Sequence, residues 1–262
     1  MQTPKCYPTD LTETQWQHIA SLLPRPKKRG RPPVDRRWVI HALLYLLRSG
    51  CSWRMLPREF PHWRTVYGYF QHWTRSGLWD TLWEYLRAWA RLQAGHRCAP
   101  TAGIVDSQSI KTADQGGERG YDAGKHIVGR KRHLLVDTLG LILEVVVTSA
   151  AVQDRDGARG VLGALRQNWS RLTRVWADGG YTGELVHWVW HLRSQRRVRL
   201  EIVKRNELRS GFHVLPKRWI VERTFGWLLK FRRLRSDYER LTSHSRAMIQ
   251  LAMINIVLRR IH

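Results

Sequence analysis

Apolar side chains recur three and four residues apart through the first part of the chain, which is the spacing of one face of an α-helix. One such group lies within residues 10–24, where an N-cap signal precedes it and a proline ends it. Three more groups occupy residues 38–50, 61–77 and 78–89, each bounded by glycine or proline. The pattern predicts an all-helical N-terminal region.

Beyond Pro100 the pattern changes to short runs of leucine and β-branched residues, which are typical of strands. Runs at 104–105, 134–136 and 141–148 predict three strands, the last two joined as a hairpin by the turn at 137–140. The later segments read as a helix, a strand, a helix, a strand and a basic helical end, at 156–169, 174–177, 183–194, 199–203 and 216–261. We therefore expect a mixed α/β (α+β) fold with a mixed sheet flanked by helices. The predicted domains are 1–95 and 96–262.

The charge balance adds a polyanionic partner to this picture. The 262 residues include 45 lysines and arginines against 21 acidic residues, a net charge of +24, so nucleic acid is the expected ligand. An apolar content of 43% is enough for a folded core and excludes a chain that is disordered throughout. No run reaches the roughly 18 apolar residues of a membrane span, and no signal-peptide pattern opens the chain, so we expect a cytoplasmic protein. The scattered Cys6, Cys51 and Cys98 indicate neither disulfides nor zinc.

The helical pairs in the N-terminal region are typical of a helix-turn-helix DNA reader. The candidate reading face lies in the third predicted helix, opposite its apolar stripe, and carries Arg64, Thr65, His72 and Arg75. The same polar face also fits a helical cap that only packs on the rest of the protein.

Two further basic segments could contact DNA. The segment at 25–37 is too rich in proline and charge to fold, and its Arg29 and Arg31 flank a glycine, as in arms that enter a narrow minor groove. A solvated linker explains it equally well. The loop at 114–129 is rich in glycine but lacks the phosphate-loop pattern, so we interpret it as a basic loop with Lys125 on the DNA backbone. We include the adjacent Arg130 and Lys131 among the expected DNA contacts.

Three carboxylates stand where metal ligands could be held. Asp106 lies in a predicted strand, Asp178 follows a short apolar run and precedes two glycines, and Glu222 lies in a predicted helix. Divalent cations held by carboxylates catalyse phosphoryl displacement, so the three suggest a nuclease centre. Each also has an ordinary interpretation as a strand-edge, turn or surface residue. Asp137 is a rival ligand, although its sequence context favours a hairpin turn.

The order and surroundings of these carboxylates resemble a known family. Asp106, the segment 176–181 and the segment 218–225 resemble the three signatures of DDE transposases from bacterial insertion sequences, closest to the insertion sequence 5 family. Residues 129–141 and 152–158 are similar as well, as is the N-terminal part. The resemblance thus covers almost the whole chain.

The resemblance implies a ribonuclease H-like catalytic domain behind a helix-turn-helix-like one. Asp106, Asp178 and Glu222 would bind two Mg²⁺ or Mn²⁺ ions and be the catalytic residues. It further implies cleavage of double-stranded DNA at terminal inverted repeats, transfer of the 3′-end to target DNA, and at least a homodimer at the bacterial nucleoid. A nuclease or resolvase on the same fold, which never joins strands, is the alternative. A DNA-binding repressor is a third possibility, against which the intact carboxylate set argues.

The resemblance also bears on the cations around Glu222. Related families have an arginine before and a lysine after the glutamate. Arg218 matches, whereas Leu229 occupies the lysine position, so Lys230 is the expected substitute. On a continuous helix Arg218 and Arg233 would lie on the same side as Glu222. We expect all three cations to hold DNA phosphates.

Overall fold

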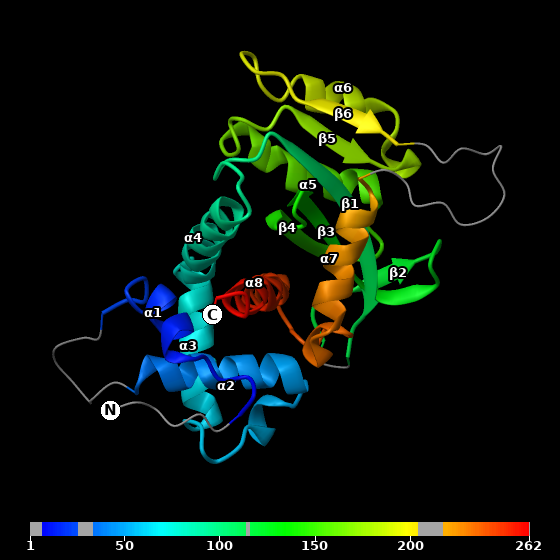
Figure 1. Cartoon of the computed structure of the whole chain (residues 1–262). Helices are drawn as coiled ribbons and strands as arrows, with labels where there is room; N and C mark the ends of the chain where they lie inside the picture. Colours follow the sequence, from blue (N-terminus) through cyan, green and yellow to red (C-terminus); the bar gives the residue numbers. More distant parts are fainter. Residues whose placement is uncertain (1–6, 26–33, 114–115, 204–216, 262) are drawn as a thin grey trace. The chain divides into compact units, whose positions relative to one another are not determined.

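The computed structural model describes residues 7–25, 34–113, 116–203 and 217–261 (Figure 1). The chain forms two compact units. A helical unit contains residues 1–90, 228–235 and 243–262, and an α/β unit contains residues 91–227 and 236–242. The predicted boundary at residue 95 lies near the first of these divisions. The prediction placed the whole C-terminal region with the sheet, whereas most of it after residue 228 belongs to the helical unit.

The helical unit is built around a C-terminal helix. Its elements are α1 (Glu13–Ala20), α2 (Arg36–Ser49), the 3₁₀ turn η1 (Trp53–Met55), α3 (Trp63–Arg75), most of α4 (Leu78–Gln93), the 3₁₀ turn η4 (Arg232–Leu234) and α8 (Thr242–Leu258). Helix α8 is buried on most sides because its sequence is almost uncharged. Its Arg246 Nη2 lies 2.6 Å from Asp80 Oδ1 of α4. The ring centroids of His244 and of Phe70 on α3 are 5.2 Å apart.

Local sequence signals set the ends of these helices. Thr12 and Gln15 form a reciprocal capping box at the start of α1, which satisfies two backbone N–H groups that have no partner within the helix. Gly50 ends α2 in the left-handed conformation, with φ +75°. A side chain at position 50 would also be strained against η4, because its Cβ would lie 2.9 Å from that of Arg232.

The α/β unit contains a six-stranded mixed sheet with the order β2-β3-β1-β5-β6, and β4 also pairs with β3. The strands are β1 (Ala102–Lys111), β2 (Gly120–Asp122), β3 (Ile127–Asp137), β4 (Ile142–Ser149), β5 (Arg174–Ala177) and β6 (Arg199–Ile202). Strand β3 runs antiparallel to β1, β2 and β4, whereas β5 runs parallel to β1 and β6. The predicted mixed α/β fold is therefore confirmed. Strand β2 was missed, since its residues were assigned to a loop.

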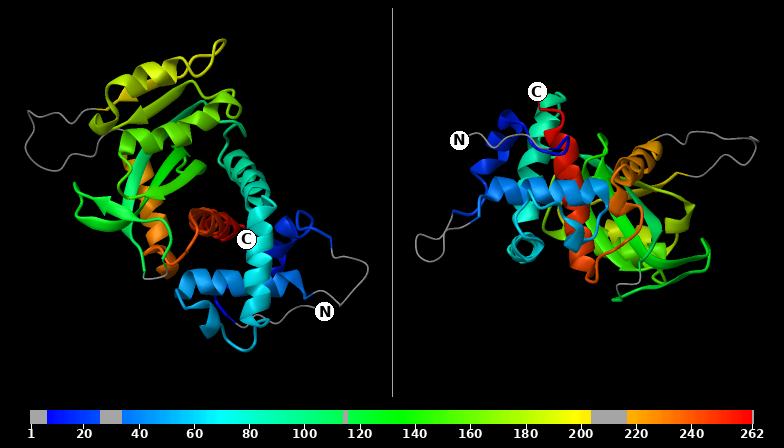
Figure 2. Two further views of the ribbon diagram at one scale, coloured as in Figure 1. Left: turned by 180° about the vertical axis from the view of Figure 1, so that it is seen from behind. Right: turned by 90° about the horizontal axis from the view of Figure 1, so that it is seen from below.

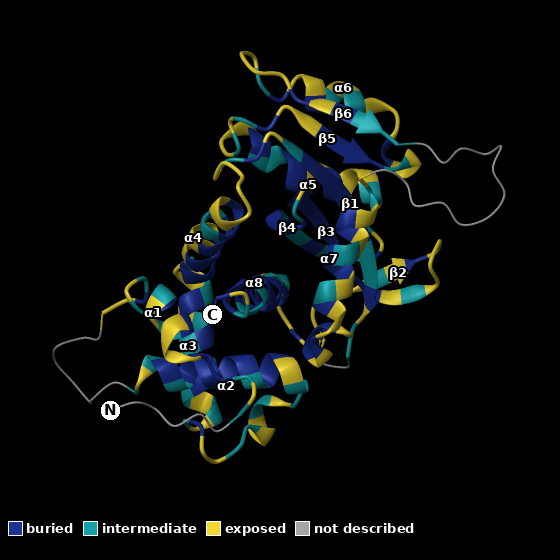
Figure 3. Ribbon diagram, in the orientation of Figure 1, coloured by how far each residue is buried: buried dark blue, intermediate teal, exposed yellow. Residues whose placement is uncertain are grey.

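Helices cover both faces of the sheet (Figures 1 and 2). Helices α5 (Asp154–Gly163) and α6 (Glu184–Trp190) pack on one face, where a core cluster includes Val105, Leu135 and Val175. Helix α7 (Trp219–Leu229) lies on the opposite face, and its Thr224 donates a hydrogen bond to the Gly140 carbonyl at 2.8 Å. Figure 3 shows the central strands as the most buried part of this unit. No helix among the described residues is long and apolar enough to cross a membrane.

Asp137 organises the β3–β4 hairpin, as its sequence context indicated. Its Oδ1 accepts hydrogen bonds from the Leu139 and Leu141 N–H groups, both at 2.9 Å, and its Oδ2 pairs with Arg91. The carboxylate is fully buried and its oxygens are engaged by protein groups. A structural role accounts for its contacts.

Two glycines of α5 make a matched test of the packing between this helix and the sheet. A methyl group at Gly157 would overlap the buried His133 ring, so Gly157→Ala should lower the free energy of unfolding by about 2 kcal/mol. A Cβ at position 160 would lie 3.6 Å from Val146 Cγ1, which is an ordinary contact distance. Gly160→Ala should therefore raise the free energy of unfolding by about 0.5–1 kcal/mol. Urea denaturation of both variants measures the difference. Equal effects of the two substitutions would contradict this packing.

Candidate active site

The parallel pairing of β1 with β5 brings two of the three carboxylates together. Ile104 is in register with Trp176, and Asp106 and Asp178 each follow two residues later. Because alternate residues of a strand share a face, both carboxylates point away from the core formed with α5 and α6. Neighbouring strands lie about 4.8 Å apart, so Asp106 and Asp178 are side by side where β5 ends.

Arg218 joins the third carboxylate to this pair. Its Nη2 lies 3.5 Å from Asp178 Oδ2 and 3.8 Å from Glu222 Oε1. Arg218 directly precedes α7, and Glu222 lies one turn along the same helix, so the start of α7 is the element that presents both. Asp178 and Glu222 keep 33% and 57% of their side chains exposed, which leaves them accessible to a ligand.

Burial dominates the electrostatics of Asp106. Burial, with a smaller contribution from the negative charge of Asp178, raises the pKa of the Asp106 carboxyl from its ordinary 3.8 to about 6. A hydrogen bond from the Ser107 N–H at 2.7 Å and the positive charges of Arg218 and Lys125 act in the opposite direction. The negative charge of Asp106 is therefore not fully compensated by the positive charges around it.

A layer of buried polar groups lies next to these carboxylates. Lys131 Nζ lies 2.9 Å from Asp154 and 3.3 Å from Asp122, and it donates a hydrogen bond to the Val152 carbonyl. Tyr181 is 1% exposed, and burial raises the pKa of its hydroxyl, with Asp106 and Asp154 adding to the effect. Neither Tyr181 nor Asp154 was predicted to lie here, although both are inside the segments that carried the family resemblance.

Helix α7 also carries an aromatic and cationic surface that the sequence analysis missed. The Arg223 guanidinium lies between the rings of Trp219 and Trp227, at 4.6 and 4.7 Å from their centroids. Lys217 Nζ lies 4.0 Å from the centroid of the Trp176 ring on β5. The spacing of Trp219, Arg223 and Trp227 is that of consecutive helical turns, which is the signal that could have revealed this arrangement.

The structure places two of the predicted DNA contacts inside the fold. Arg130 is 0% exposed and donates hydrogen bonds to the carbonyls of Glu118, Glu239 and Arg240, with Asp237 at 3.3 Å. Lys131 is 5% exposed and bound as described above. Both are therefore structural cations, and their position in β3 does not present them to DNA. A run of adjacent basic residues looks the same in sequence whether it faces solvent or buried partners.

The end of α7 changes the prediction made for Arg233. The helix stops at Leu229, so the helical angle argument that set Arg233 beside Glu222 does not apply. Arg233 is 4% exposed, donates a hydrogen bond to the Cys51 carbonyl at 2.8 Å, and lies over the Trp53 ring. It belongs to the helical unit, as does the exposed Lys230.

The remaining predicted contacts are exposed or outside the described residues. Lys125 is exposed beyond β2 and close enough to influence the pKa of Asp106. Arg64 and Arg75 are exposed on α3. Arg29 and Arg31 lie outside the described residues.

Comparison with known proteins identifies the family of the chain. Residues 97–256 match the family described as "Transposase DDE domain", and residues 11–92 match "Putative transposase of IS4/5 family". The chain therefore belongs to the DDE transposases of the IS4/IS5 type, and its sheet is the ribonuclease H-like fold of that catalytic domain. Transposase domains of this family cleave DNA and generally use divalent metal ions.

Curated relatives come from two bacteria. A protein of Burkholderia cepacia named "Insertion element IS402 uncharacterized 16.2 kDa protein" is 35% identical over 116 residues, 40% of this chain and 75% of that protein. "Putative transposase for insertion sequence element IS402", from the same organism, is 31% identical over 131 residues, 47% of this chain and 60% of that protein. "Uncharacterized protein y4sN" of Sinorhizobium fredii is 32% identical over 84 residues, 32% of this chain and 67% of that protein. No solved structure matches the chain.

Replacing Asp106 by asparagine tests the electrostatics of the site in metal-free buffer. The folded state holds a proton on Asp106 more tightly than the unfolded state, because the pKa is raised from 3.8 to about 6. The stabilisation that this proton gives is therefore present below the ordinary pKa and lost as pH rises through about 6. Wild type should therefore lose stability relative to Asp106→Asn as the pH rises across that interval. Urea midpoints of both proteins between about pH 4 and pH 7.5 measure the difference. A constant difference at all pH values would contradict the shift.

Proposed function

We propose that this chain binds the terminal inverted repeats of its insertion sequence, cleaves DNA there and transfers the cut strand to target DNA. Asp106, Asp178 and Glu222 would hold two Mg²⁺ or Mn²⁺ ions for this chemistry. The observation that supports this most is the bridge from Arg218 to Asp178 and Glu222, with Asp106 set beside Asp178 by strand register.

The donor set suits hard divalent cations, because all three candidate ligands offer carboxylate oxygens. The raised pKa of Asp106, beside the charge of Asp178, indicates a site that a cation would stabilise. Among the described residues, no group of three acidic, histidine or cysteine side chains already has a metal-binding arrangement. Arg218 accounts for part of this, since its guanidinium lies between Asp178 and Glu222. When bound, the metal ions would activate the attacking oxygen and stabilise the leaving oxygen.

The side chains around the carboxylates would then position DNA. Arg218 can pair with a phosphate once the carboxylates are neutralised, since a guanidinium binds carboxylate and phosphate in the same bidentate geometry. Lys125 can bring a second positive charge to the same phosphate, because it is exposed and close enough to influence Asp106. These two residues would hold the scissile strand while the carboxylates hold the metal.

Helix α3 is the proposed reader of the terminal repeats. Its exposed Arg64, Gly68, His72 and Arg75 lie along one side of the helix. The apolar Val66, Phe70 and Trp73 are buried on the other side. Space around Gly68 is open, with no heavy atom within 4 Å of the position that a Cβ would take. Packing therefore does not require this mid-helix glycine, but close approach of a DNA groove would.

Strand transfer requires two element ends in one complex, so the active form would contain at least two copies of the chain. A nuclease or resolvase without joining activity remains the alternative, and it uses the same three carboxylates. Only the fate of the 3′-end separates the two functions.

The substitution Asp178→Asn tests the catalytic assignment against a matched control. Asp156→Asn removes the same charge from an exposed position in the first turn of α5. On duplexes carrying DNA that flanks the open reading frame, Asp178→Asn should lower Mg²⁺-dependent cleavage at least about 100-fold, because metal charge stabilisation of several kcal/mol is lost. Asp156→Asn should cut as wild type, and both should bind the duplex equally.

Cleavage and joining are followed on sequencing gels and with a labelled target plasmid. Full activity of Asp178→Asn would remove Asp178 from the site. Cleavage by wild type without joining would support the nuclease alternative.

The substitution Arg75→Gln tests the role of α3. It should weaken binding to the terminal-repeat duplex about tenfold and to a scrambled duplex less, because a base contact contributes only with the right sequence. The control is Arg58→Gln, which changes an exposed arginine of the same unit outside α3. It should leave the ratio of the affinities for the two duplexes unchanged. Fluorescence anisotropy with both duplexes gives the ratio. Equal losses on the two duplexes would show that Arg75 does not read bases.

A further inference from the structure

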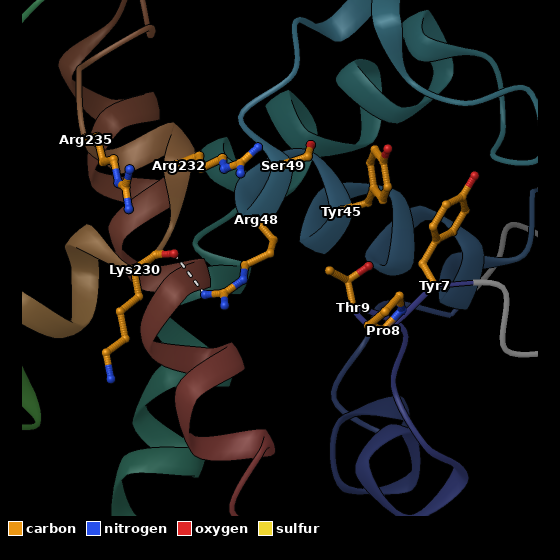
Figure 4. A pocket seen from close by; sticks show the side chains of 9 residues that line it. All are labelled: Tyr7, Pro8, Thr9, Tyr45, Arg48, Ser49, Lys230, Arg232 and Arg235. Carbon is orange, nitrogen blue, oxygen red and sulfur yellow. Dashed lines mark hydrogen bonds between the residues drawn. The ribbon is translucent and has the colours of Figure 1, made fainter.

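The helical unit contains a basic pocket, and none of its lining residues is among those proposed to cut DNA or to read its sequence. It has a volume of about 470 Å³ and lies between the N-terminal segment, the end of α2 and the chain around η4 (Figure 4). Four of its lining residues are cations: Arg48, Lys230, Arg232 and Arg235. None of the lining residues is acidic. The prediction of DNA contacts included only Lys230 of this group.

Backbone contacts fix two of the four cations in place. Arg48 Nη1 donates to the Lys230 carbonyl at 2.9 Å, and Arg235 Nε donates to the Leu229 carbonyl at 3.1 Å. Each guanidinium has five N–H donors, so these contacts leave most of the donors available. The side chain of Arg232 makes no hydrogen bond or ion pair with any other described residue. The left-handed Gly50 permits this packing, because it brings the end of α2 against Arg232.

Like charges held together at a pocket need a reason, since their mutual repulsion lowers stability. The nearby carboxylates do not supply one. Asp10 is fully buried with His41 at 3.7 Å, and Glu59 accepts a hydrogen bond from the Tyr7 hydroxyl at 3.3 Å. Neither residue lines the pocket. An anionic ligand would relieve the repulsion.

A second, independent observation concerns Thr9, which also lines the pocket. Its Oγ1 is buried and has no hydrogen-bond partner among the described residues. Buried hydroxyl groups in folded proteins are nearly always paired with protein or water. The Thr9 hydroxyl is therefore an unused hydrogen-bond donor in the wall of the pocket.

We propose that this pocket binds a backbone phosphate of DNA, an inference that rests on the proposed function. Arginine and lysine with a hydroxyl donor are typical phosphate ligands. The volume exceeds that of one phosphate group and leaves room for the adjoining sugar. All four cations are exposed, so a continuous DNA strand can run across them. The pocket therefore adds affinity that does not depend on sequence.

The substitution Arg232→Gln tests the pocket through the salt dependence of DNA binding. Binding of the full chain to a fluorescein-labelled random 30-bp duplex is measured in EDTA at several KCl concentrations. Losing one phosphate contact makes the negative slope of log K against log salt shallower by about one. It also lowers the affinity by about eightfold at about 0.1 M salt. Arg58→Gln, outside the pocket, should keep the wild-type slope, and Arg232→Lys should restore most of it. Circular dichroism verifies that each variant is folded.

The possible outcomes distinguish a failure of the pocket from a failure of the proposed function. Wild-type binding with an unchanged slope in Arg232→Gln overturns the pocket and leaves the proposed function standing. An equal loss in Arg58→Gln also overturns it, because the effect is then one of net charge. Loss of inorganic phosphate binding in Arg232→Gln, together with unchanged DNA binding, would identify a free-anion site and overturn the proposal. Failure of wild type to bind DNA overturns both proposals.

Discussion

The parallel pairing of β1 with β5 is the constraint on which the candidate site depends. It sets Asp106 beside Asp178 on one sheet face, although the two residues are far apart in the sequence. Because strand neighbours have a fixed spacing, the carboxylates are held close despite their repulsion. Helix α7 then brings Glu222 and Arg218 to the same face. The core between the sheet and helices α5 and α6 stabilises this pairing from behind.

Buried charges support the sheet beneath the site. Strand β3 carries Arg130, Lys131, Arg132 and His133, and all four are buried. Lys131 holds Asp122 and Asp154, whereas Arg130 ties the strand to the segment around Asp237. Burial lowers the pKa of Arg132 to about 10 and that of His133 to about 4. Part of the strong positive charge therefore maintains the fold, whereas cations such as Arg64 and Arg75 on α3 and those of the basic pocket are exposed.

Local patterns in the sequence predicted most of the helices and strands, and the three carboxylates were proposed from their order and from the family resemblance of their surroundings. The strand at 174–177 and the capped start of α1 depend on neighbouring residues only, so they could be predicted well. The sequence could not show which residues, far apart along the chain, come into contact in the folded protein. The burial of Arg130 and Lys131, the end of α7 at Leu229 and the return of α8 to the helical unit all depend on such contacts. The pocket arises in the same way, from three separate segments.

The proposed chemistry requires that Asp106, Asp178 and Glu222 hold metal together. Iron-mediated cleavage of the polypeptide tests it most directly, because Fe²⁺ in a carboxylate site with ascorbate and peroxide generates radicals that cut the nearby backbone. We expect cuts near residues 106, 178 and 222, all suppressed by excess Mg²⁺ and reduced together by Asp178→Asn. Cuts confined to the Asp122 and Asp154 region, or cuts that Asp178→Asn leaves unchanged, would contradict it.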